Sequence, residues 1–307
     1  MSIARLRQLA RAARLLPRAA DLTRRHGRPP AVIYFGEAPG DDLLATAILA
    51  QWHTTHGTRP WYLTRHPTLF ARSPDVALVL DYDPELAGAL SLLGVRRIRL
   101  RYRTYDAATD RMIGPKGVHI IDVMCASAGL PPPANPAPLF YFADGERPPR
   151  AGAPRLVVQS SGMSARFPHL TKEWFPERMQ DAIDALRHDA EIVQIGSAAD
   201  PPLEGARDLR GRTTIREAAS LLASAWGFVG LIGFPMHLAR AVGTPSVIVY
   251  GGREHPSESG YPGNVNLFTE MHCSPCWLVN RCPYDRECLR RLTADQVVAA
   301  ARGLLFE

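Results

Sequence analysis

Residues 226–252, WGFVGLIGFPMHLARAVGTPSVIVYGG, contain two short apolar runs on either side of a helical pattern. The first run, WGFVGLIG, and the last, PSVIVYGG, are typical of buried strands that are bounded by glycine or proline. Between them, PMHLARAVG predicts a helix that stops at Gly243. A strand, a helix and a second strand in this order predict a βαβ unit with two parallel strands.

Strands and helices alternate on both sides of this unit. Capping boxes predict two helix starts, one at Thr214 with Glu217 and one at Thr293 with Gln296. In the second half, the predicted strands are 155–162 and 190–198, and the predicted helices are 176–187, 213–225 and 293–305. In the first half, the predicted strands are 31–35, 60–66, 76–83 and 95–103, the predicted helices are 2–25, 43–52 and 84–94, and 117–130 reads as a strand that runs into a helix.

A proline-rich stretch separates the two halves of the chain. Eight prolines lie between Pro131 and Pro154, and LFYFA at residues 139–143 is compatible with a surface strand. The chain has 307 residues, and at roughly 150 residues per domain this length predicts two domains. We therefore expect two doubly wound α/β domains, residues 1–150 and 151–307, with ligands at the carboxyl ends of the strands.

The composition predicts an anionic partner. The formal net charge is +6, the sequence pI is about 9.3, and Lys116 and Lys172 are the two lysines of a chain otherwise rich in arginine. Nucleotides, anionic lipid and phosphorylated glycans fit this charge, whereas the scattered arginines without an aromatic platform argue against nucleic acid. Residues 2–25 predict a basic amphipathic helix, which either touches an anionic membrane or packs on its own domain.

The sequence predicts neither secretion nor a membrane span. The N-terminus lacks a continuous apolar core and a cleavage site. The uncharged stretch 218–236 is interrupted by three glycines, which favour a helix end, a buried strand and a loop over a span. We therefore expect a reducing cytoplasm, where metal binding or free thiols are more common than disulfides.

Two aspartates follow the first predicted strand, in GEAPGDD at residues 36–42. Glycine and proline put them at a strand-to-helix turn, where a carboxylate can act as general base for a hydroxyl nucleophile. Asp41 is the first candidate, and Asp42 and Glu37 compete with it. The alternative is an acidic first turn that favours the helix start and has no catalytic role.

A second strand-to-helix turn, in VVQSSGMSARFPHLTKEWFPERM, suits an anion. The small residues Ser161 and Gly162 leave backbone N–H groups free to meet a phosphate, and Arg166 and Lys172 add positive charge. The alternative is a polar surface loop.

A third turn, in GLIGFPMHLARAVG, leads through Gly233 into a helix. The free N-terminus of that helix attracts an anion, and His237 in its first turn can donate to a phosphate or a sugar. The alternative is a structural histidine.

Four of the five cysteines lie close together, with the spacing C-x2-C-x5-C-x5-C. They are Cys273, Cys276, Cys282 and Cys288. Four thiols can close a tetrahedral site for Zn or Fe, and such a site would be structural because it leaves no position for water. Reduced thiols and a disulfide are the alternatives. Cys125, in a predicted core helix, is expected to be a plain buried residue.

The order and spacing of these segments resemble glycosyltransferase family 9, the ADP-heptose:lipopolysaccharide heptosyltransferases. The resemblance lies in PGDDLLATAILAQW, KEWFPERMQDAIDAL, LRGRTTIREAASLLASA, PMHLARAVGTPSVIVYGG and the CSPC…C…C tail, and it covers about residues 32–305. It implies a GT-B fold, in which two Rossmann-like domains face a central cleft. It also implies an inverting sugar transfer from a nucleotide donor, bound by residues 151–307, to a hydroxyl acceptor, bound by residues 1–150.

The resemblance implies roles for individual residues. Asp41 would be the general base, and Lys172 would contact the donor phosphate. The further donor-binding positions that it implies are Thr213, Thr214, Pro235, Met236 and His237. Lys172, Arg166 and helix N-termini would stabilise the leaving nucleoside diphosphate, so we expect catalysis without a magnesium ion or other cofactor. A protein-directed branch of the heptosyltransferases carries a four-cysteine iron site, which fits a structural Fe as well as Zn.

The chain departs from the family pattern at one turn. The family usually has D-[ST]-G-P-M-H, but here Ile232 stands in place of the acid and Phe234 in place of the glycine. Because that acid often contacts the donor, the donor remains either ADP-heptose or another NDP-sugar. We expect transfer to lipopolysaccharide core or a related surface glycan at the inner-membrane periphery. A protein O-heptosyltransferase and a non-catalytic nucleotide-sugar-binding protein are the alternatives.

Overall fold

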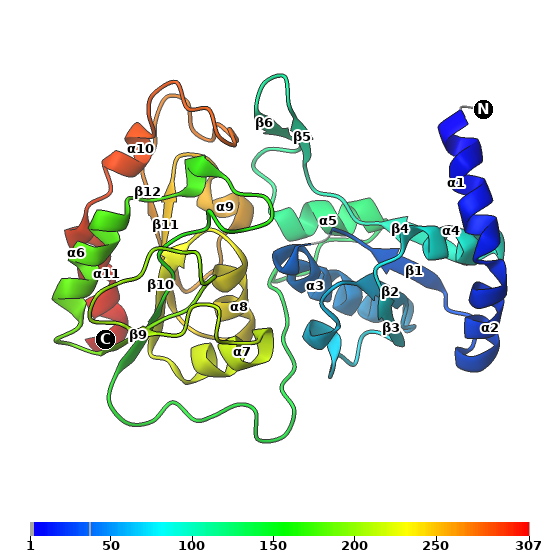
Figure 1. The fold of residues 1–307 in the computed structure, drawn as a ribbon, viewed down its shortest axis with the longest axis horizontal. Helices are drawn as coiled ribbons and strands as arrows, with labels where there is room; N and C mark the ends of the chain where they lie inside the picture. Colours follow the sequence, from blue (N-terminus) through cyan, green and yellow to red (C-terminus); the bar gives the residue numbers. More distant parts are fainter. Residues whose placement is uncertain (1–2, 37, 307) are drawn as a thin grey trace. The chain divides into compact units, whose positions relative to one another are not determined.

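The computed structural model describes residues 3–36 and 38–306 (Figure 1). Contacts divide the chain into two compact units. The N-terminal unit consists of the described residues up to Tyr102 together with Ile121–Pro136, and the C-terminal unit consists of Arg103–Ile120 and the described residues from Ala137 onward. This division differs from a single boundary at residue 150, because Arg103–Ile120 packs with the second unit. The assignment of acceptor and donor to the two halves stays a prediction.

The N-terminal unit is built on a parallel four-stranded sheet with the order β3-β2-β1-β4. The strands are β1 Ala31–Tyr34, β2 Trp61–Thr64, β3 Leu78–Asp81 and β4 Arg96–Arg99. The chain winds outward from β1 to β3 and then returns to β4 on the other side of β1. The carboxyl ends of β1 and β4 therefore form the switch point of this sheet, where α/β sheets bind ligands.

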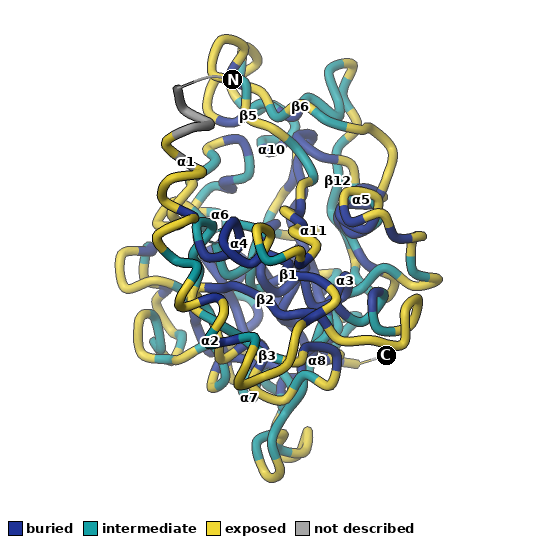
Figure 2. Tube along the Cα trace, turned by 90° about the vertical axis from the view of Figure 1, so that its right-hand side faces the viewer, coloured by how far each residue is buried: buried dark blue, intermediate teal, exposed yellow. Residues whose placement is uncertain are grey.

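Helices cover both faces of this sheet. The longer helices are α1 Ile3–Arg14, α2 Leu16–His26, α3 Pro39–His56, α4 Pro84–Leu92 and α5 Ile120–Ala128, and η1 Pro67–Phe70 is a short 3₁₀ turn. Helices α2 and α4 share an apolar core with β1 and β2, and α1 packs on α4. Figure 2 shows α3 and α5 on the other side of the buried strands.

The predicted N-terminal helix is divided into α1 and α2 by a break at Leu15. Ala12 is buried, and Arg11 forms an ion pair of 3.2 Å with Glu85 at the start of α4. These contacts support packing of the basic helices on their own unit. Contact with a membrane stays a prediction. Within the described residues, no helix is long and apolar enough to span a membrane.

The C-terminal unit has a parallel six-stranded sheet with the order β12-β11-β10-β7-β8-β9. The strands are β7 Arg155–Val158, β8 Glu191–Gln194, β9 Arg207–Asp208, β10 Gly227–Leu231, β11 Ser246–Gly251 and β12 Asn264–Phe268. This is the doubly wound order, with the switch point between β7 and β10. The βαβ unit predicted from residues 226–252 is confirmed, since β10 and β11 pair in parallel.

Helices α6 Pro176–Leu186 and α11 Ala294–Phe306 lie on one side of this sheet, and α7 Ile215–Ser224 and α8 Phe234–Val242 lie on the other (Figure 1). The first pair closes an apolar core over β7, β10 and β11. The short elements are η2 Leu170–Lys172, α9 Pro256–Ser259 and α10 Glu287–Arg290. Both predicted capping boxes are present, and α8 stops at Gly243 in the left-handed conformation.

Two predicted strands are wrong. Within residues 117–130 the chain forms helix α5 without a preceding strand, and LFYFA at 139–143 forms no strand among the described residues. Helix α3 also begins at Pro39 rather than at Leu43, because proline fits the first helical position. This earlier start brings both aspartates of the GEAPGDD turn into the first turn of the helix.

A β-hairpin that the sequence analysis missed joins the C-terminal unit. Its strands are β5 Thr104–Asp106 and β6 Arg111–Ile113, which pair antiparallel. Met112 N–H donates to the Trp277 carbonyl at 2.9 Å, and the Asp110 carboxylate accepts the Asn280 N–H at 2.7 Å. The hairpin therefore packs against the cysteine segment.

The carboxylate of Glu258 joins this hairpin to the loop after β11. Its side chain is buried, and it accepts hydrogen bonds from Arg103 Nη2 at 2.9 Å, Gly117 N–H at 2.8 Å and Trp277 Nε1 at 2.9 Å. The Arg103 guanidinium also stacks on the Trp277 ring at 3.4 Å. One buried acid thus joins both ends of the hairpin to the cysteine segment.

We expect Glu258→Ala to lower the free energy of unfolding by about 3–5 kcal/mol, because it leaves the buried Arg103 cation without its partner. Exposed Glu204 is the matched control, and Glu204→Ala should stay within about 0.5 kcal/mol of the wild type. Guanidinium chloride titration measures both variants. Equal midpoints for the two variants would contradict the role given to Glu258.

Candidate active site

The switch point of the C-terminal sheet brings together the two turns that were predicted to bind an anion. Strand β7 ends at Val158 and leads to Ser161 and Gly162, whereas β10 ends at Leu231 and leads through Gly233 into α8. Because β7 and β10 are hydrogen-bonded neighbours, these two turns leave the same edge of the sheet.

Lys172 supplies a cation to this edge. It ends the 3₁₀ turn η2, and its Nζ lies 2.7 Å from Glu254 Oε1. The Glu254 side chain is 3% exposed and the Lys172 side chain 23% exposed. The Glu254 carboxylate is thus enclosed, while part of the Lys172 side chain is exposed.

Glu254 is a site residue that the sequence analysis missed. Its Oε1 contacts Lys172 and Arg253, and its Oε2 accepts the Ser259 hydroxyl at 2.8 Å. Burial raises the pKa of Glu254, but the Lys172 and Arg253 cations outweigh burial and hold the pKa well below its usual range. One feature of the sequence could have indicated Glu254: the charged run REHPSE follows a buried strand. Loops that follow the strands of such a sheet lie at its ligand-binding edge.

Met236 and His237 lie in the first turn of α8, and both are buried. His237 Nδ1 is 2.6 Å from the Tyr261 hydroxyl, and Tyr250 donates to Met236 Sδ at 3.6 Å. Burial, assisted by the Lys172 cation, lowers the pKa of His237 to about 3, so the imidazole is neutral. These contacts make both side chains supports of the helix start.

The backbone at the start of α8 is available to a ligand. Gly233 is the N-cap and makes no side-chain cap, and Gly233 and Pro235 are both half-buried. The helix has nine residues, and the N–H groups of its first turn carry a partial positive charge. The predicted free N-terminus is therefore present.

The loop after β7 uses its polar groups internally. Gly162 N–H donates to Glu173 Oε2 at 2.9 Å, so the expectation that this N–H is free for phosphate is wrong. Ser161 Oγ accepts the Met163 N–H at 3.1 Å. Arg166 in the same loop is exposed. The loop thus has an exposed arginine, whereas the Gly162 N–H is already hydrogen-bonded within the loop.

Thr213 and Thr214 precede α7. The Thr214 hydroxyl accepts the Glu217 N–H at 3.2 Å as the helix cap. Within the described residues, no hydrogen bond or ion pair joins either threonine to Lys172 or His237. Their donor contact stays a prediction.

Asp41 lies at the switch point of the N-terminal sheet. It is half-buried in the first turn of α3, and Tyr102, just past β4, donates its hydroxyl to Asp41 Oδ1 at 3.4 Å. A Cβ at Gly36 would clash with Asp41 Oδ2, so glycine at this position lets the carboxylate lie against the turn. Asp41 thus lies half-buried at this edge of the sheet, next to Tyr102.

Asp42, one residue later, is fully buried. Tyr62 donates to its Oδ1 at 2.7 Å, and Thr64 and His66 contact its Oδ2 at 2.5 and 2.8 Å. Both oxygens are therefore occupied in tying α3 to the end of β2, which argues against Asp42 as the base. Glu37, the other competitor, lies outside the described residues.

The cysteine segment packs directly beside Lys172. Thr171 N–H donates to the Val279 carbonyl at 3.2 Å, and Thr171 Oγ1 donates to the Leu278 carbonyl at 2.5 Å. Arg253 Nε donates to the same Leu278 carbonyl at 2.9 Å. The segment thus holds both neighbours of the Lys172–Glu254 pair.

All five cysteines are free, and Cys125 is buried as expected. Burial raises the pKa of the Cys276 and Cys288 thiols, and each thiol also feels the charge of Cys273. Arg286 N–H donates to Cys282 Sγ at 3.3 Å. No group of three or more His, Cys, Asp or Glu side chains in the described ranges is arranged to hold a metal ion.

We expect acid to destabilise the C-terminal unit through His237. Below its ordinary pKa of 6.5 the unfolded chain protonates this histidine, whereas the folded chain does not until about pH 3. The free energy of unfolding should therefore fall as the pH drops from 6.5 to 3, and His237→Gln should flatten that slope. The half-buried His169, whose pKa is also lowered to about 3 by burial, retains part of this slope.

Denaturant titrations at several pH values measure this slope. Exposed His188 is the matched control, and His188→Gln should reproduce the wild-type dependence. A His237→Gln variant with the wild-type slope would show that the histidine is not held neutral.

Comparison with known proteins finds relatives of part of the sequence and of the fold. A family model described as glycosyltransferase family 9 (heptosyltransferase) matches residues 186–284, which include α7, β10, α8 and β11. Lipopolysaccharide heptosyltransferase 3 of Escherichia coli is 25% identical over 152 residues. This match spans 44% of the chain and less than half of the relative, 43% of its length.

Solved structures resemble the chain over most of its length. The iron-containing dodecameric glycosyltransferase TibC of enterotoxigenic E. coli has a TM-score of 0.71 at 20% identity, over 90% of this chain and 76% of that one. TibC in complex with ADP-D-β-D-heptose has a TM-score of 0.68 at 18% identity, with the same shares covered. E. coli ADP-heptose lps heptosyltransferase II has a TM-score of 0.64 at 16% identity, over 90% of this chain and 98% of that one.

The expected GT-B fold class is confirmed by these structures, which share the arrangement of two parallel α/β sheets. The resemblance that the motifs indicated is confirmed by the family model and the curated relative. The chain therefore has the fold of these solved glycosyltransferases, and its residues 186–284 are similar to glycosyltransferase family 9 (heptosyltransferase).

Proposed function

We propose that the chain is an inverting glycosyltransferase that moves a sugar from a nucleoside-diphosphate donor to an acceptor hydroxyl. The observation that carries this proposal is Lys172, whose ammonium group is held by the buried Glu254 at the switch point of the C-terminal sheet. A fixed cation near an uncapped helix N-terminus suits a diphosphate. Positive charge that is already oriented stabilises the negative charge that develops on the leaving group.

On the donor side, Lys172 and the first turn of α8 would bind the diphosphate, and exposed Arg166 would add a second cation. ADP-heptose is the first donor to test, since TibC, a structural relative, forms a complex with ADP-D-β-D-heptose. Ile232 is 6% exposed and offers no polar atom to the sugar, which keeps another NDP-sugar as the alternative.

On the acceptor side, Asp41 would act as the general base. The acceptor oxygen attacks the anomeric carbon, its proton passes to an Asp41 carboxylate oxygen, and the bond to the diphosphate breaks with its electron pair on the leaving group. Attack from the face opposite the diphosphate inverts the anomeric configuration. Tyr102, which donates to Asp41 Oδ1, would orient the base.

We further propose lipopolysaccharide core or a related surface glycan as the acceptor, which is consistent with the name of the curated relative. A protein acceptor is the alternative, and the cysteine segment together with the likeness to iron-containing TibC favours it. A non-catalytic nucleotide-sugar-binding protein is the second alternative, supported by apolar Ile232. Action in the cytoplasm, at the periphery of the inner membrane, follows from nucleotide donors and the basic helices α1 and α2.

We expect Asp41→Asn to reduce sugar transfer by about 100- to 10,000-fold, because the amide cannot take the proton. Donor affinity should stay within about twofold of the wild type, because the proposed donor residues are in the other unit. The transfer rate is measured with a panel of NDP-sugars and cell-envelope extract as the source of acceptors. The donor affinity is measured by calorimetry with the same NDP-sugars.

Exposed Asp81, at the end of β3, is the matched control, and Asp81→Asn should keep wild-type transfer. If the wild type binds donors but transfers sugar to no acceptor in the extract, the enzyme proposal fails and the binding-protein alternative holds.

A structural metal in the cysteine segment is the second part of the proposal. Cys273, Cys276, Cys282 and Cys288 would hold one Zn or Fe and so stiffen the segment that contacts Thr171 and Arg253. The metal would take no part in the transfer, since four thiolates leave no open position.

We expect elemental analysis to find about one Zn or Fe per chain, and Cys273→Ser with Cys276→Ser to lose it. The melting temperature should fall in that variant, because the metal would close the segment. Cys125→Ser is the control, since this buried cysteine lies in α5, and it should retain the metal. A wild-type protein that is stable without metal would sink this part of the proposal.

A further inference from the structure

Strand β4 carries arginines on one face. In the run RRIRLR, Arg97, Arg99 and Arg101 alternate with Ile98 and Leu100, which are both buried. Successive side chains of a strand point to opposite faces, so Arg97 and Arg99 share one face of β4, and Arg101 follows two residues after the strand ends. β4 is also the edge strand of the N-terminal sheet, so β1 is its one neighbouring strand in that sheet.

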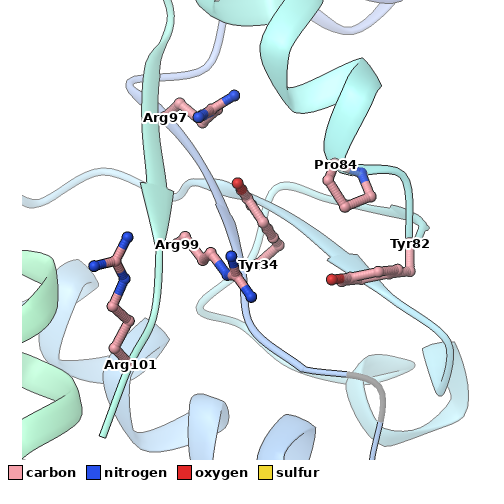
Figure 3. Close-up of a pocket in the computed structure, with 6 residues that line it drawn as sticks. All are labelled: Tyr34, Tyr82, Pro84, Arg97, Arg99 and Arg101. Carbon is pink, nitrogen blue, oxygen red and sulfur yellow. The ribbon is translucent and has the colours of Figure 1, made fainter. Parts of the chain in front are cut away.

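These arginines line a cavity of about 390 Å³ together with Tyr34, Tyr82 and Pro84. Figure 3 shows Arg97 and Arg99 extending from β4 toward the side where the two tyrosines and the proline lie. The Tyr34 and Tyr82 rings meet edge to face at 6.2 Å. The volume falls within the range of about 300–1,000 Å³ that is typical of small-molecule pockets.

The charge of this cavity is unbalanced. None of its six lining residues is acidic, and within the described residues no ion pair engages Arg97, Arg99 or Arg101. The nearby acid Asp83 already caps α4 through the Glu85 and Leu86 N–H groups, and it lies 3.6 Å from Arg18. Three guanidinium groups without an acidic partner beside a pocket favour the binding of a multivalent oxyanion.

We propose that this pocket binds a phosphate monoester carried by the acceptor sugar, an inference that rests on the proposed glycosyl transfer. A phosphate monoester carries a charge of about −1.5 to −2 and three acceptor oxygens, which match three guanidinium forks better than a carboxylate does. The tyrosine rings provide a wall of a size suited to the sugar that bears the phosphate.

The position of the pocket fits this role. Tyr34 is the last residue of β1, and Arg99 is the last residue of β4, so the pocket opens at the same edge of the sheet as Asp41. Tyr102, directly after Arg101, donates to the Asp41 carboxylate. A sugar phosphate held by the arginines would thus lie on the same unit and edge as the proposed base, which makes phosphorylation of the acceptor a determinant of specificity.

An apolar groove adjoins the pocket. It shares Pro84 and Arg97 with the pocket and is otherwise lined partly by Leu9, Leu92 and Val95. A phosphate on a membrane lipid is therefore the competing source of the same chemistry, and the experiment separates the two sources.

The test measures calorimetric affinity for glucose 6-phosphate, with glucose as the uncharged comparison. The wild type should bind glucose 6-phosphate and not glucose, and Arg97→Gln with Arg99→Gln should weaken binding by about tenfold or more. The matched control is Arg59→Gln with Arg72→Gln, which removes two exposed arginines of the same unit and should leave the affinity unchanged.

Vesicles of phosphatidylcholine with phosphatidylglycerol form the second arm. Binding of glucose 6-phosphate that is lost in the Arg97/Arg99 variant supports the proposal. No binding by the wild type, or equal binding by the variant, overturns it. Vesicle binding that the variant loses, without any glucose 6-phosphate binding, also overturns it and assigns the pocket to a lipid headgroup.

The sugar-transfer assay separates this inference from the proposed function. If the wild type transfers sugar but does not bind glucose 6-phosphate, the phosphate-site inference is wrong and the proposed glycosyl transfer is unaffected. Binding at the arginines without transfer from any donor contradicts the glycosyltransferase proposal, and the pocket would then stand as a phosphate site of a binding protein.

Discussion

Two carboxylates buried in the loop after β11 need cationic partners, and the C-terminal unit is organised around that need. Removing one partner of a buried ion pair costs several kcal/mol, because the remaining charge has neither water nor a counterion. Glu254 forms ion pairs with Lys172 and Arg253, and Glu258 forms one with Arg103. One loop thereby determines where the donor-side lysine lies, where the β5–β6 hairpin packs and where the cysteine segment rests.

The two sheets present their chemistry in the same manner. In each, the chain reverses its winding direction next to the first strand, at β1 and β4 in one unit and at β7 and β10 in the other. The N-terminal switch point carries a carboxylate, Asp41, whereas the C-terminal one carries a cation and a helix N-terminus. In the proposed function, proton removal and leaving-group stabilisation would therefore be carried out by residues on separate sheets.

The sequence alone predicted much of this fold, because its signals are local. Apolar runs predicted most of the strands. The pairs Thr214–Glu217 and Thr293–Gln296 predicted two helix starts, because their hydrogen bonds form within a single helical turn. The β5–β6 hairpin was missed because its strands are short, half exposed and stabilised mainly by the distant cysteine segment.

The site was predicted in part for the same physical reason. Lys172 and Asp41 stand out by residue type next to a turn, and motif spacing finds them. Glu254, by contrast, is a site residue only because Lys172 folds back onto it across 82 positions of sequence, and Gly162 loses its free N–H to Glu173 for a similar reason. The difference between Asp41 and Asp42 follows from the hydroxyls that surround the second carboxylate, and no local pattern records these.

The path of the chain through the two units limits how this architecture can be recombined. Residues 103–120 serve the C-terminal unit, yet the chain then returns to the N-terminal unit for 121–136 before it leaves again. A half-protein cut at residue 137 would lack Arg103 and Gly117, so that Glu258 and Trp277 would be left without their partners. An exchange of sugar-donor halves between relatives of this chain therefore has to carry the hairpin along as a second, discontinuous piece, which favours inheritance of the two units together.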